Sequence, residues 1–320
     1  MSGKSPDPET LARVYRSLRL IRRTEEEIAR IYPSDKIKSP VHLSIGQESV
    51  SVGVCDVLKK DDFMSATYRG HAAYLAKGGN IKHMLAELYG KSTGGAGGKA
   101  GSMHLVDMEA GVLGMSAVVG TTIPVAAGYA LAMKRENKGR VTACFFGDGA
   151  TEEGVFSETL NFAALHKLPI LFICENNGFA IHSPLSHRWA KDALCERVRT
   201  YSIPTSEIND ANVFTIRQAA EDALKRIRSG EGPQFMECKT YRWREHVGPG
   251  EDYDDDYRSR DELSFWQRND PIIITAKMLT STEREAIDAN VETIIADAIV
   301  FAENSPWPEP KELFSHVYAD

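Results

Sequence analysis

The hydrophobic pattern of the chain predicts two buried strands joined by a helix in its central part. The run VTACFF at 141–146 is almost unbroken in its apolar character, as in a strand that is covered on both faces. Apolar residues then recur at helical spacing, namely Val155, Phe156, Leu160 and Ala163. A second apolar run, PILFIC at 169–174, follows. We therefore expect a β-α-β unit within an α/β fold, with a mostly parallel central sheet and helices on both of its faces.

Both ends of the chain have helical patterns. Asp7 and Pro8 form a helix start, and the apolar spacing continues to Tyr32. The other face of this helix carries arginines that we expect to be solvated: Arg13, Arg16, Arg19, Arg22 and Arg23. Residues 283–303 form another helical stretch. No linker divides the chain, so we expect one domain, 1–320, with an N-terminal helix and a C-terminal helical extension.

Composition excludes some classes of function. The net charge is −7, and no basic stripe is present, which argues against a nucleic-acid partner. No apolar run approaches the roughly 18 residues of a membrane span, so we expect no membrane partner. The five cysteines form no CxxC pair, which is typical of a reduced, cytoplasmic protein.

Polar residues follow each of the two predicted strands. Asp148 lies in the turn after the first strand, and Asn177 follows the second. The carboxyl ends of parallel strands meet at one edge of a sheet, where such folds bind ligands. The Asp148 carboxylate, the Asn177 amide oxygen and a carbonyl of the irregular backbone beyond Asn177 suit Mg²⁺, and we assign the carbonyl to Phe179. Gly149 and Ala150 are predicted to open a helix, whose N–H groups favour phosphate, so a diphosphate bridged by Mg²⁺ fits.

Two commoner nucleotide motifs are excluded. The Rossmann pattern requires a third glycine where Glu152 stands. The glycine-rich segment at 92–104 fails as a P-loop, because Thr93 replaces its first glycine and Ala100 replaces its metal-binding Ser or Thr. Gly-Asp-Gly and Asn-Asn are each common turn sequences. Their occurrence at the ends of two buried strands, at 147–149 and 176–177, disfavours a purely structural explanation.

GDG followed by NN at this separation resembles the thiamin-diphosphate-binding motif. The surrounding sequence, NFAALHKLPILFICENNGFAIHSP, resembles the alpha subunit of the 2-oxo-acid dehydrogenase first component. This family includes pyruvate, branched-chain 2-oxo-acid and acetoin dehydrogenases. The resemblance extends from about Leu11 to the carboxyl terminus. It implies a thiamin-diphosphate-binding fold, with thiamin diphosphate and Mg²⁺ as cofactors.

The resemblance also implies roles for particular residues. His42, in VHLSIGQE, matches a histidine that lines the substrate end of the active site, where it would contact substrate or handle protons. His246 matches a second loop histidine that reaches the diphosphate or the reacting centre. Tyr68 and Arg69 match a pair that holds the diphosphate, for which a guanidinium is well suited.

Two loops are assigned by the same resemblance. The segment Ala117-Val118-Val119-Gly120 matches the loop that contacts the aminopyrimidine ring, through the backbone at Ala117 and with Val119 pressing on the ring. The glycine-rich segment 92–104 resembles a GKxGSMH loop, and we expect it to be flexible and close to the active-site entrance.

The chain departs from the family pattern in two places. It has REHVG at 244–248 where the dehydrogenases have a histidine-rich loop, and His182 replaces a small residue. The substrate therefore need not be one of those of the named dehydrogenases, and the roles of His182 and of the Arg244-Glu245-His246 variant stay open. The acidic segment GEDYDDDY at 250–257 is predicted to be a solvated loop.

By resemblance, the chain is the alpha subunit of an oxidoreductase that decarboxylates a 2-oxo acid or cleaves acetoin and passes the acyl unit to a lipoyl carrier. A beta subunit would supply the glutamate that activates the cofactor, in an assembly of two alpha and two beta chains that could also bind a lipoyl acyltransferase. The alternative is a split transketolase-like or synthase subunit, which passes its two-carbon unit to an aldehyde. A non-catalytic subunit is disfavoured by the intact set of predicted site residues.

Overall fold

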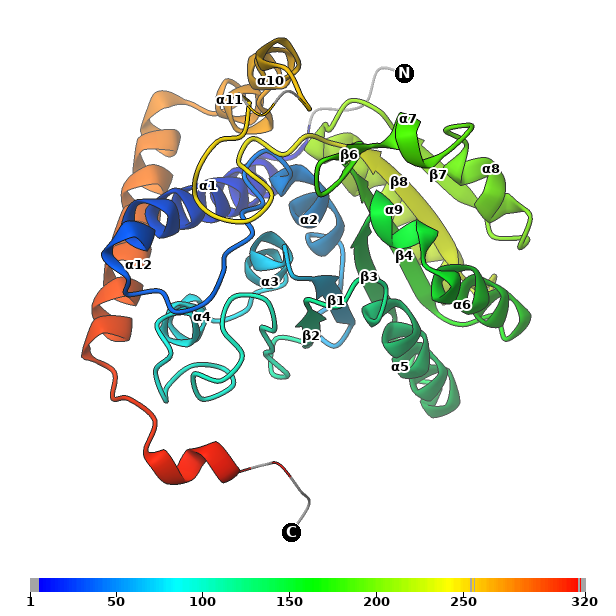
Figure 1. Ribbon diagram of the computed structural model, residues 1–320. Coiled ribbons are helices and arrows are strands. Elements are labelled where there is room, and N and C mark those ends of the chain that lie inside the picture. The colour runs from blue at the N-terminus through cyan, green and yellow to red at the C-terminus, as the bar shows by residue number, and fades with distance from the viewer. Residues whose placement is uncertain (1–5, 254, 256, 316, 318–320) are drawn as a thin grey trace.

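The computed structural model describes residues 6–253, 255, 257–315 and 317, and its centre is a six-stranded sheet (Figure 1). The strand order is β2-β1-β3-β4-β8-β7, and every neighbouring pair is parallel. The strands are β1 (Phe63–Thr67), β2 (Val112–Ser116), β3 (Thr142–Gly147), β4 (Ile170–Asn176), β7 (Thr205–Ile208) and β8 (Gln234–Lys239). A small antiparallel hairpin is formed by β5 (Phe179–Ala180) and β6 (Ser183–Pro184). The predicted α/β fold with a parallel sheet is confirmed.

The two central apolar runs are β3 and β4, and their side chains alternate between two hydrophobic cores. One core contains Ala143, Phe145, Leu171 and Ile173. The other contains Cys144, Phe146, Phe172 and Cys174. Successive residues of a strand point to opposite faces, so a strand covered on both faces must be apolar at every position. This arrangement explains why the two runs lack polar alternation.

Helices cover both faces of the sheet, as predicted. The first core is closed by α1 (Pro8–Ile31), α2 (Glu48–Cys55), α3 (His71–Ala76), α4 (Ile81–Leu88), α9 (Val213–Arg228) and α12 (Ser281–Asn304). The second is closed by α5 (Thr122–Glu136), α6 (Gly154–Leu165) and α8 (Leu194–Arg199). The remaining helices are α7 (Leu185–Arg188), α10 (Arg260–Arg268) and α11 (Pro271–Ala276). No helix among the described residues is long and apolar enough to cross a membrane.

The C-terminal helix α12 packs along α1 and α4 (Figure 1). Its Ala298 and Ala302 belong to the first core. Asp7 caps α1 by accepting from the Thr10 N–H at 2.9 Å, and Pro8 occupies the first turn, as predicted. The helical extension is therefore joined to the same core as the N-terminal helix.

One arginine of α1 contradicts the prediction of a solvated face. Arg22 is 5% exposed. Its guanidinium forms ion pairs with Glu48 of α2 and with Asp270, the N-cap of α11, and lies 4.3 Å from the Trp243 ring centroid. Because α2 and α11 cover this side of α1, the charge is compensated inside the protein.

The glycine-rich segment 92–104 is wound around the carboxylate of Glu87, which α4 carries into the interior. The backbone N–H groups of Ala96 and Gly98 donate to Oε2, both at 2.9 Å. Those of Ala100 and Gly101 donate to Oε1 at 2.7 and 3.1 Å. Four hydrogen bonds to one buried carboxylate therefore hold the segment in place, which the prediction of a flexible loop did not include.

We expect Glu87→Gln to lower the free energy of unfolding by about 2–3 kcal/mol. An amide has only one acceptor oxygen, and its NH₂ group would face two of the four N–H donors. Urea unfolding at neutral pH would measure the loss, with the exposed Glu285→Gln on α12 as the matched control. Equal stability of the two variants would contradict this account of the segment.

Candidate active site

The carboxyl ends of four parallel strands surround a cavity of about 290 Å³. The predicted residues that line it are Tyr68, Arg69, Val119, Asp148, Gly149, Ala150, Asn177, Phe179 and His246. These residues follow β1, β2, β3 and β4, except His246, which lies in the loop after β8, so the parallel sheet brings together residues that are far apart in the sequence. The cavity occupies the edge at which open α/β sheets bind ligands.

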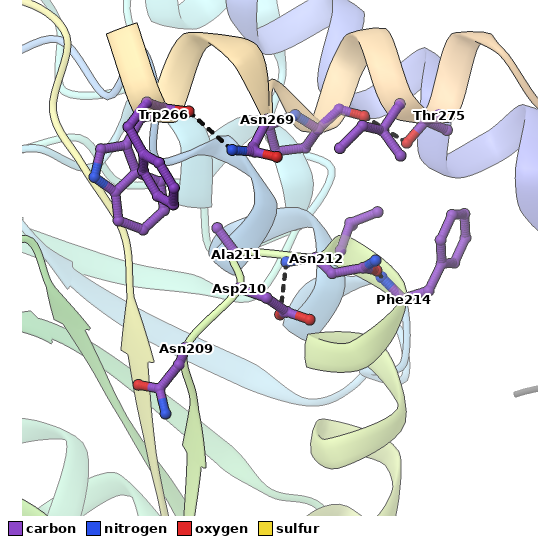
Figure 2. A pocket seen from close by; sticks show the side chains of 12 residues that line it. Asn209, Asp210, Ala211, Asn212, Phe214, Trp266, Asn269 and Thr275 are labelled. Atoms are coloured by element: carbon purple, nitrogen blue, oxygen red, sulfur yellow. Dashed lines mark hydrogen bonds between the residues drawn. The ribbon is translucent and has the colours of Figure 1, made fainter. Parts of the chain in front are cut away.

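A larger hollow, of about 370 Å³, lies between residues 209–214 and 265–275 (Figure 2). Its labelled polar side chains serve local turns. Asn212 caps α9, Asp210 accepts from the Asn212 N–H, and Asn269 donates to the Phe265 carbonyl. None of the predicted site residues lines this hollow, and we do not assign it a function.

Asp148 has one carboxylate oxygen engaged and one without a partner. The side chain is 2% exposed, and Oδ2 accepts from the guanidinium of Arg188. Oδ1 is buried and has no hydrogen-bond partner. An unpartnered buried carboxylate oxygen is costly unless a cation or donor completes it. The residue therefore offers one oxygen that a metal ion could occupy.

The segment around Gly149 and Ala150 differs from the predicted helix start. Residues Asp148–Glu152 form a single 3₁₀ turn, and α6 begins only at Gly154. The backbone of the 3₁₀ turn still lines the cavity at Gly149 and Ala150. A Cβ on Gly149 would approach the Ala180 Cβ to 2.9 Å, so the turn packs closely against the β5–β6 hairpin. The close packing explains the need for glycine.

Asn177 is oriented by hydrogen bonds on both sides of its amide. Its Nδ2 donates to the Gln47 Oε1 at 3.0 Å, and its Oδ1 accepts from the Phe179 N–H at 3.1 Å. Phe179 pairs with Pro184 in the hairpin, and proline has no N–H to donate to the Phe179 carbonyl. Both residues line the cavity, and the Asn177 amide is held in a defined orientation.

Among the described residues, no three His, Cys, Asp or Glu side chains form a cluster that could hold a metal ion. An ion at Asp148 would depend on the Asn177 amide, a backbone carbonyl and oxygens from a ligand. This requirement suits Mg²⁺, which is usually bound by one or two carboxylates together with phosphate oxygens and water.

Arg69 brings a positive charge to the cavity wall. It is 8% exposed; its Nη1 donates to the Leu43 carbonyl at 2.7 Å, and its Nη2 to the His246 carbonyl at 2.9 Å. It takes part in none of the ion pairs found among the described residues. Burial lowers the pKa of Arg69 to about 10. A buried guanidinium without a carboxylate partner suits an anionic ligand, and with the free Asp148 oxygen it fits a diphosphate and Mg²⁺.

The two predicted histidines meet because their segments are joined through the backbone. The Gly248 N–H donates to the Val41 carbonyl at 2.8 Å, and the Trp243 N–H donates to the Ile45 carbonyl at 2.9 Å. The rings of His42 and His246 lie 5.3 Å apart, and His42 lies 4.5 Å from the Tyr68 ring. His246 lines the cavity, whereas His42 packs behind it and outside the lining.

Both histidines are expected to stay neutral at physiological pH. Burial and then the charge of Arg69 lower the pKa of His42 and of His246 to about 3. A lowered pKa in the folded state means that neutral imidazole stabilises the fold above pH 6.5, and that this contribution is lost as the pH falls toward 3. NMR spectra should show no titration of either ring between pH 5.5 and 8. A titration midpoint near 6.5 for either ring would contradict the buried arrangement.

The loop that carries His246 rests on a buried network, which contradicts the prediction that residues 250–257 are a solvated loop. Asp252 is 4% exposed and forms ion pairs with Arg242 and Arg258. Arg258 also donates to the Arg244 carbonyl at 2.7 Å, two residues before His246. The segment folds inward because Asp252 supplies the charge that both arginines require. Asp254 and Asp256 lie outside the described residues.

The predicted aminopyrimidine loop is only partly at the cavity. Val118, Val119 and Gly120 line it, but Ala117 does not. His182 lies on the β5–β6 turn, and its ring packs 4.7 Å from that of Tyr257. The ring contact gives His182 a structural neighbour at the edge of the site.

Among the residues missed in the sequence are Gln47 and Glu175, which line the cavity, and Arg188, which contacts Asp148. Gln47 lies within VHLSIGQE, and Glu175 directly precedes the Asn176-Asn177 pair, so their positions offered a signal. Burial raises the pKa of Glu175 to about 8, partly offset by Arg69. Arg188 offered no signal, because it is one of many arginines and reaches Asp148 only through the fold.

Comparison with known proteins gives the same family across nearly the whole chain. The model of the dehydrogenase E1 component matches residues 16–311. The alpha subunit of the acetoin:2,6-dichlorophenolindophenol oxidoreductase of Bacillus subtilis is 36% identical over 99% of this chain and 96% of its own length. The pyruvate dehydrogenase E1 alpha subunit of Porphyra purpurea is 37% identical over 96% of this chain and 92% of its own length. The chain therefore belongs to the dehydrogenase E1 component family, thiamin-diphosphate-dependent oxidoreductases of the 2-oxo-acid dehydrogenase type.

Proposed function

We propose that this chain is the alpha subunit of a thiamin-diphosphate- and Mg²⁺-dependent enzyme that decarboxylates a 2-oxo acid or cleaves acetoin. The acyl unit would pass to a lipoyl carrier. The observation that carries the proposal is the pairing, in one cavity, of a buried Asp148 carboxylate oxygen without a hydrogen-bond partner and a buried Arg69 guanidinium without an ion-pair partner, both judged among the described residues. These two groups match the two charges of a metal-bound diphosphate.

Each residue of the site has a proposed task. Thiamin diphosphate, when bound, supplies the nucleophilic carbon and the electron sink of the reaction. Asp148, the Asn177 amide oxygen and the Phe179 carbonyl would hold Mg²⁺. The residues that would hold the cofactor itself are Tyr68, Arg69, Ala117, Val119, Gly149, Ala150 and His246.

His42 and His246 would act at the substrate end of the cavity. Because burial lowers the pKa of both imidazoles to about 3, each would stay neutral and suits a hydrogen bond to the substrate better than acceptance of a proton at neutral pH. His42 has a buried Nδ1 without a hydrogen-bond partner, which supports such a use. His42 lies behind His246, so His246 is the nearer of the two to the cavity.

The relatives are named as alpha subunits, which implies a beta subunit as the partner. We propose that it supplies the activating glutamate and completes the aminopyrimidine side, in an assembly of two alpha and two beta chains. Exposed apolar residues support a partner on this side: Val118 (62% exposed) and Val119 line the cavity, and Val125 and Tyr129 lie on α5. A lipoyl acyltransferase is a further proposed partner. We also propose that residues 1–320 act as one domain. We place this domain in the cytoplasm, because its five cysteines are buried and free.

The proposed activity can be tested by reduction of 2,6-dichlorophenolindophenol by the chain together with its beta subunit. Acetoin, pyruvate and branched-chain 2-oxo acids should each be offered, with thiamin diphosphate and Mg²⁺ present and then omitted. Cofactor-dependent dye reduction with one of them is the expected result. Cofactor-dependent transfer to an aldehyde, without dye reduction, would instead support the split transketolase-like or synthase alternative.

A further inference from the structure

We propose that Arg188 is a positioning residue of the metal site, which holds the Asp148 carboxylate by Oδ2 so that Oδ1 is presented to the metal ion. This inference rests on the proposed function, because it assumes that Asp148 binds Mg²⁺. It assigns a role to a residue on a different segment, between the β5–β6 hairpin and α8, which the motif does not include.

Arg188 is fixed by three groups. Its Nε donates to the Ser183 carbonyl at 3.1 Å, while its two terminal nitrogens reach Asp148 and Glu152. The Arg188 side chain is 8% exposed and that of Asp148 is 2% exposed, so water has little access to compete for the contact. A planar guanidinium bonded at all three nitrogens can turn very little.

The segment that carries Arg188 is itself tied to the second predicted ligand. The Leu185 N–H, at the start of α7, donates to the Gly178 carbonyl at 2.8 Å. Gly178 follows Asn177 directly, and Phe179 begins the hairpin. The backbone that would contribute the amide and carbonyl ligands is therefore joined to the guanidinium that fixes the carboxylate.

The two oxygens of Asp148 have different surroundings, and this difference indicates which of them would bind the metal ion. Oδ2 is engaged by Arg188, whereas Oδ1 is buried without a partner. Removal of a group that orients a metal ligand from outside the coordination sphere typically lowers the metal affinity about 10–100-fold. The opposing possibility is that the guanidinium merely competes with the metal for a shared carboxylate, in which case its removal would strengthen metal binding.

The test is a titration of Mn²⁺ into the chain assembled with its beta subunit, at a fixed excess of thiamin diphosphate. The electron paramagnetic resonance signal of free Mn²⁺ measures how much of the ion is bound. We expect Arg188→Gln to weaken Mn²⁺ binding about 10–100-fold. Arg188→Lys, which keeps the charge but not the three-point hold, should lie between this variant and the wild type. Arg199→Gln, which removes an exposed arginine from nearby α8, is the matched control and should match the wild type.

A second titration separates positioning from loss of structure. At saturating Mn²⁺, thiamin diphosphate should bind Arg188→Gln as tightly as the wild type, because the added metal restores the site. A deficit that persists there would mean that the substitution damaged the fold, and would count against the proposal. Unchanged or tighter Mn²⁺ binding by Arg188→Gln would also overturn it. If the wild type itself bound no Mn²⁺ with thiamin diphosphate, the proposed function would fail first and this inference with it.

Discussion

Asp148→Ala is expected to abolish the Mg²⁺-dependent binding of thiamin diphosphate by the assembled enzyme. The substitution removes the single carboxylate that we assign to the metal, so the protein would offer the ion only neutral amide and carbonyl oxygens. Calorimetric titration with thiamin diphosphate, with and without Mg²⁺, would measure the effect. Asp210→Ala, at the exposed edge of the larger hollow, is the control and should bind like the wild type. Undiminished affinity of Asp148→Ala would remove the basis of the proposed metal site.

Asp252→Ala should produce the largest loss of stability, about 3–5 kcal/mol in the free energy of unfolding. Without the Asp252 carboxylate, the guanidinium groups of Arg242 and Arg258 would stay buried without a counter-charge. Urea unfolding would measure the loss. Because Arg258 also holds the Arg244 carbonyl, the loop that carries His246 should loosen before the rest of the fold.

The neighbouring residue supplies the control for this prediction. Glu251 is exposed, and its contacts with Arg244 and Arg260, at 3.9 and 3.8 Å, are surface ion pairs. Such pairs are worth about 0–1 kcal/mol, so Glu251→Ala should leave stability nearly unchanged. Similar losses in the two variants would show that Asp252 is not the buried anchor of the segment.

The parallel sheet and the cofactor edge were accessible from sequence because each strand carries its own signal. The runs that became β3 and β4 are apolar at nearly every position, with Thr142 the exception, as is typical of strands covered on both faces. Asp148 and Asn177 follow these strands directly, so a correct assignment of the strands also places the two side chains at one edge.

The errors concern charges that are buried because the fold pairs each of them with an opposite charge. Arg22 resembles its solvated neighbours on α1, and Asp252 resembles the other acidic residues of its segment. Each is buried because the fold supplies a partner, Asp270 for Arg22 and Arg258 for Asp252. Local hydropathy contains no information about such pairs.

The glycine-rich segment shows a second limit. Its composition predicts flexibility, but the Glu87 carboxylate offers its backbone four hydrogen bonds from inside the protein. The organising residue lies outside the segment, on α4. The same reasoning applies to Arg188, whose contact with Asp148 depends on how the β5–β6 hairpin folds back over the site.

The central claim is that this chain supplies the diphosphate and Mg²⁺ half of an active site that a beta subunit completes. The most direct test is calorimetric titration of thiamin diphosphate with Mg²⁺ into this chain alone, and then into the chain mixed with its beta subunit. We predict tight binding only in the mixture. Tight binding by the chain alone would contradict the shared site, because it would mean that one chain builds the complete cofactor site.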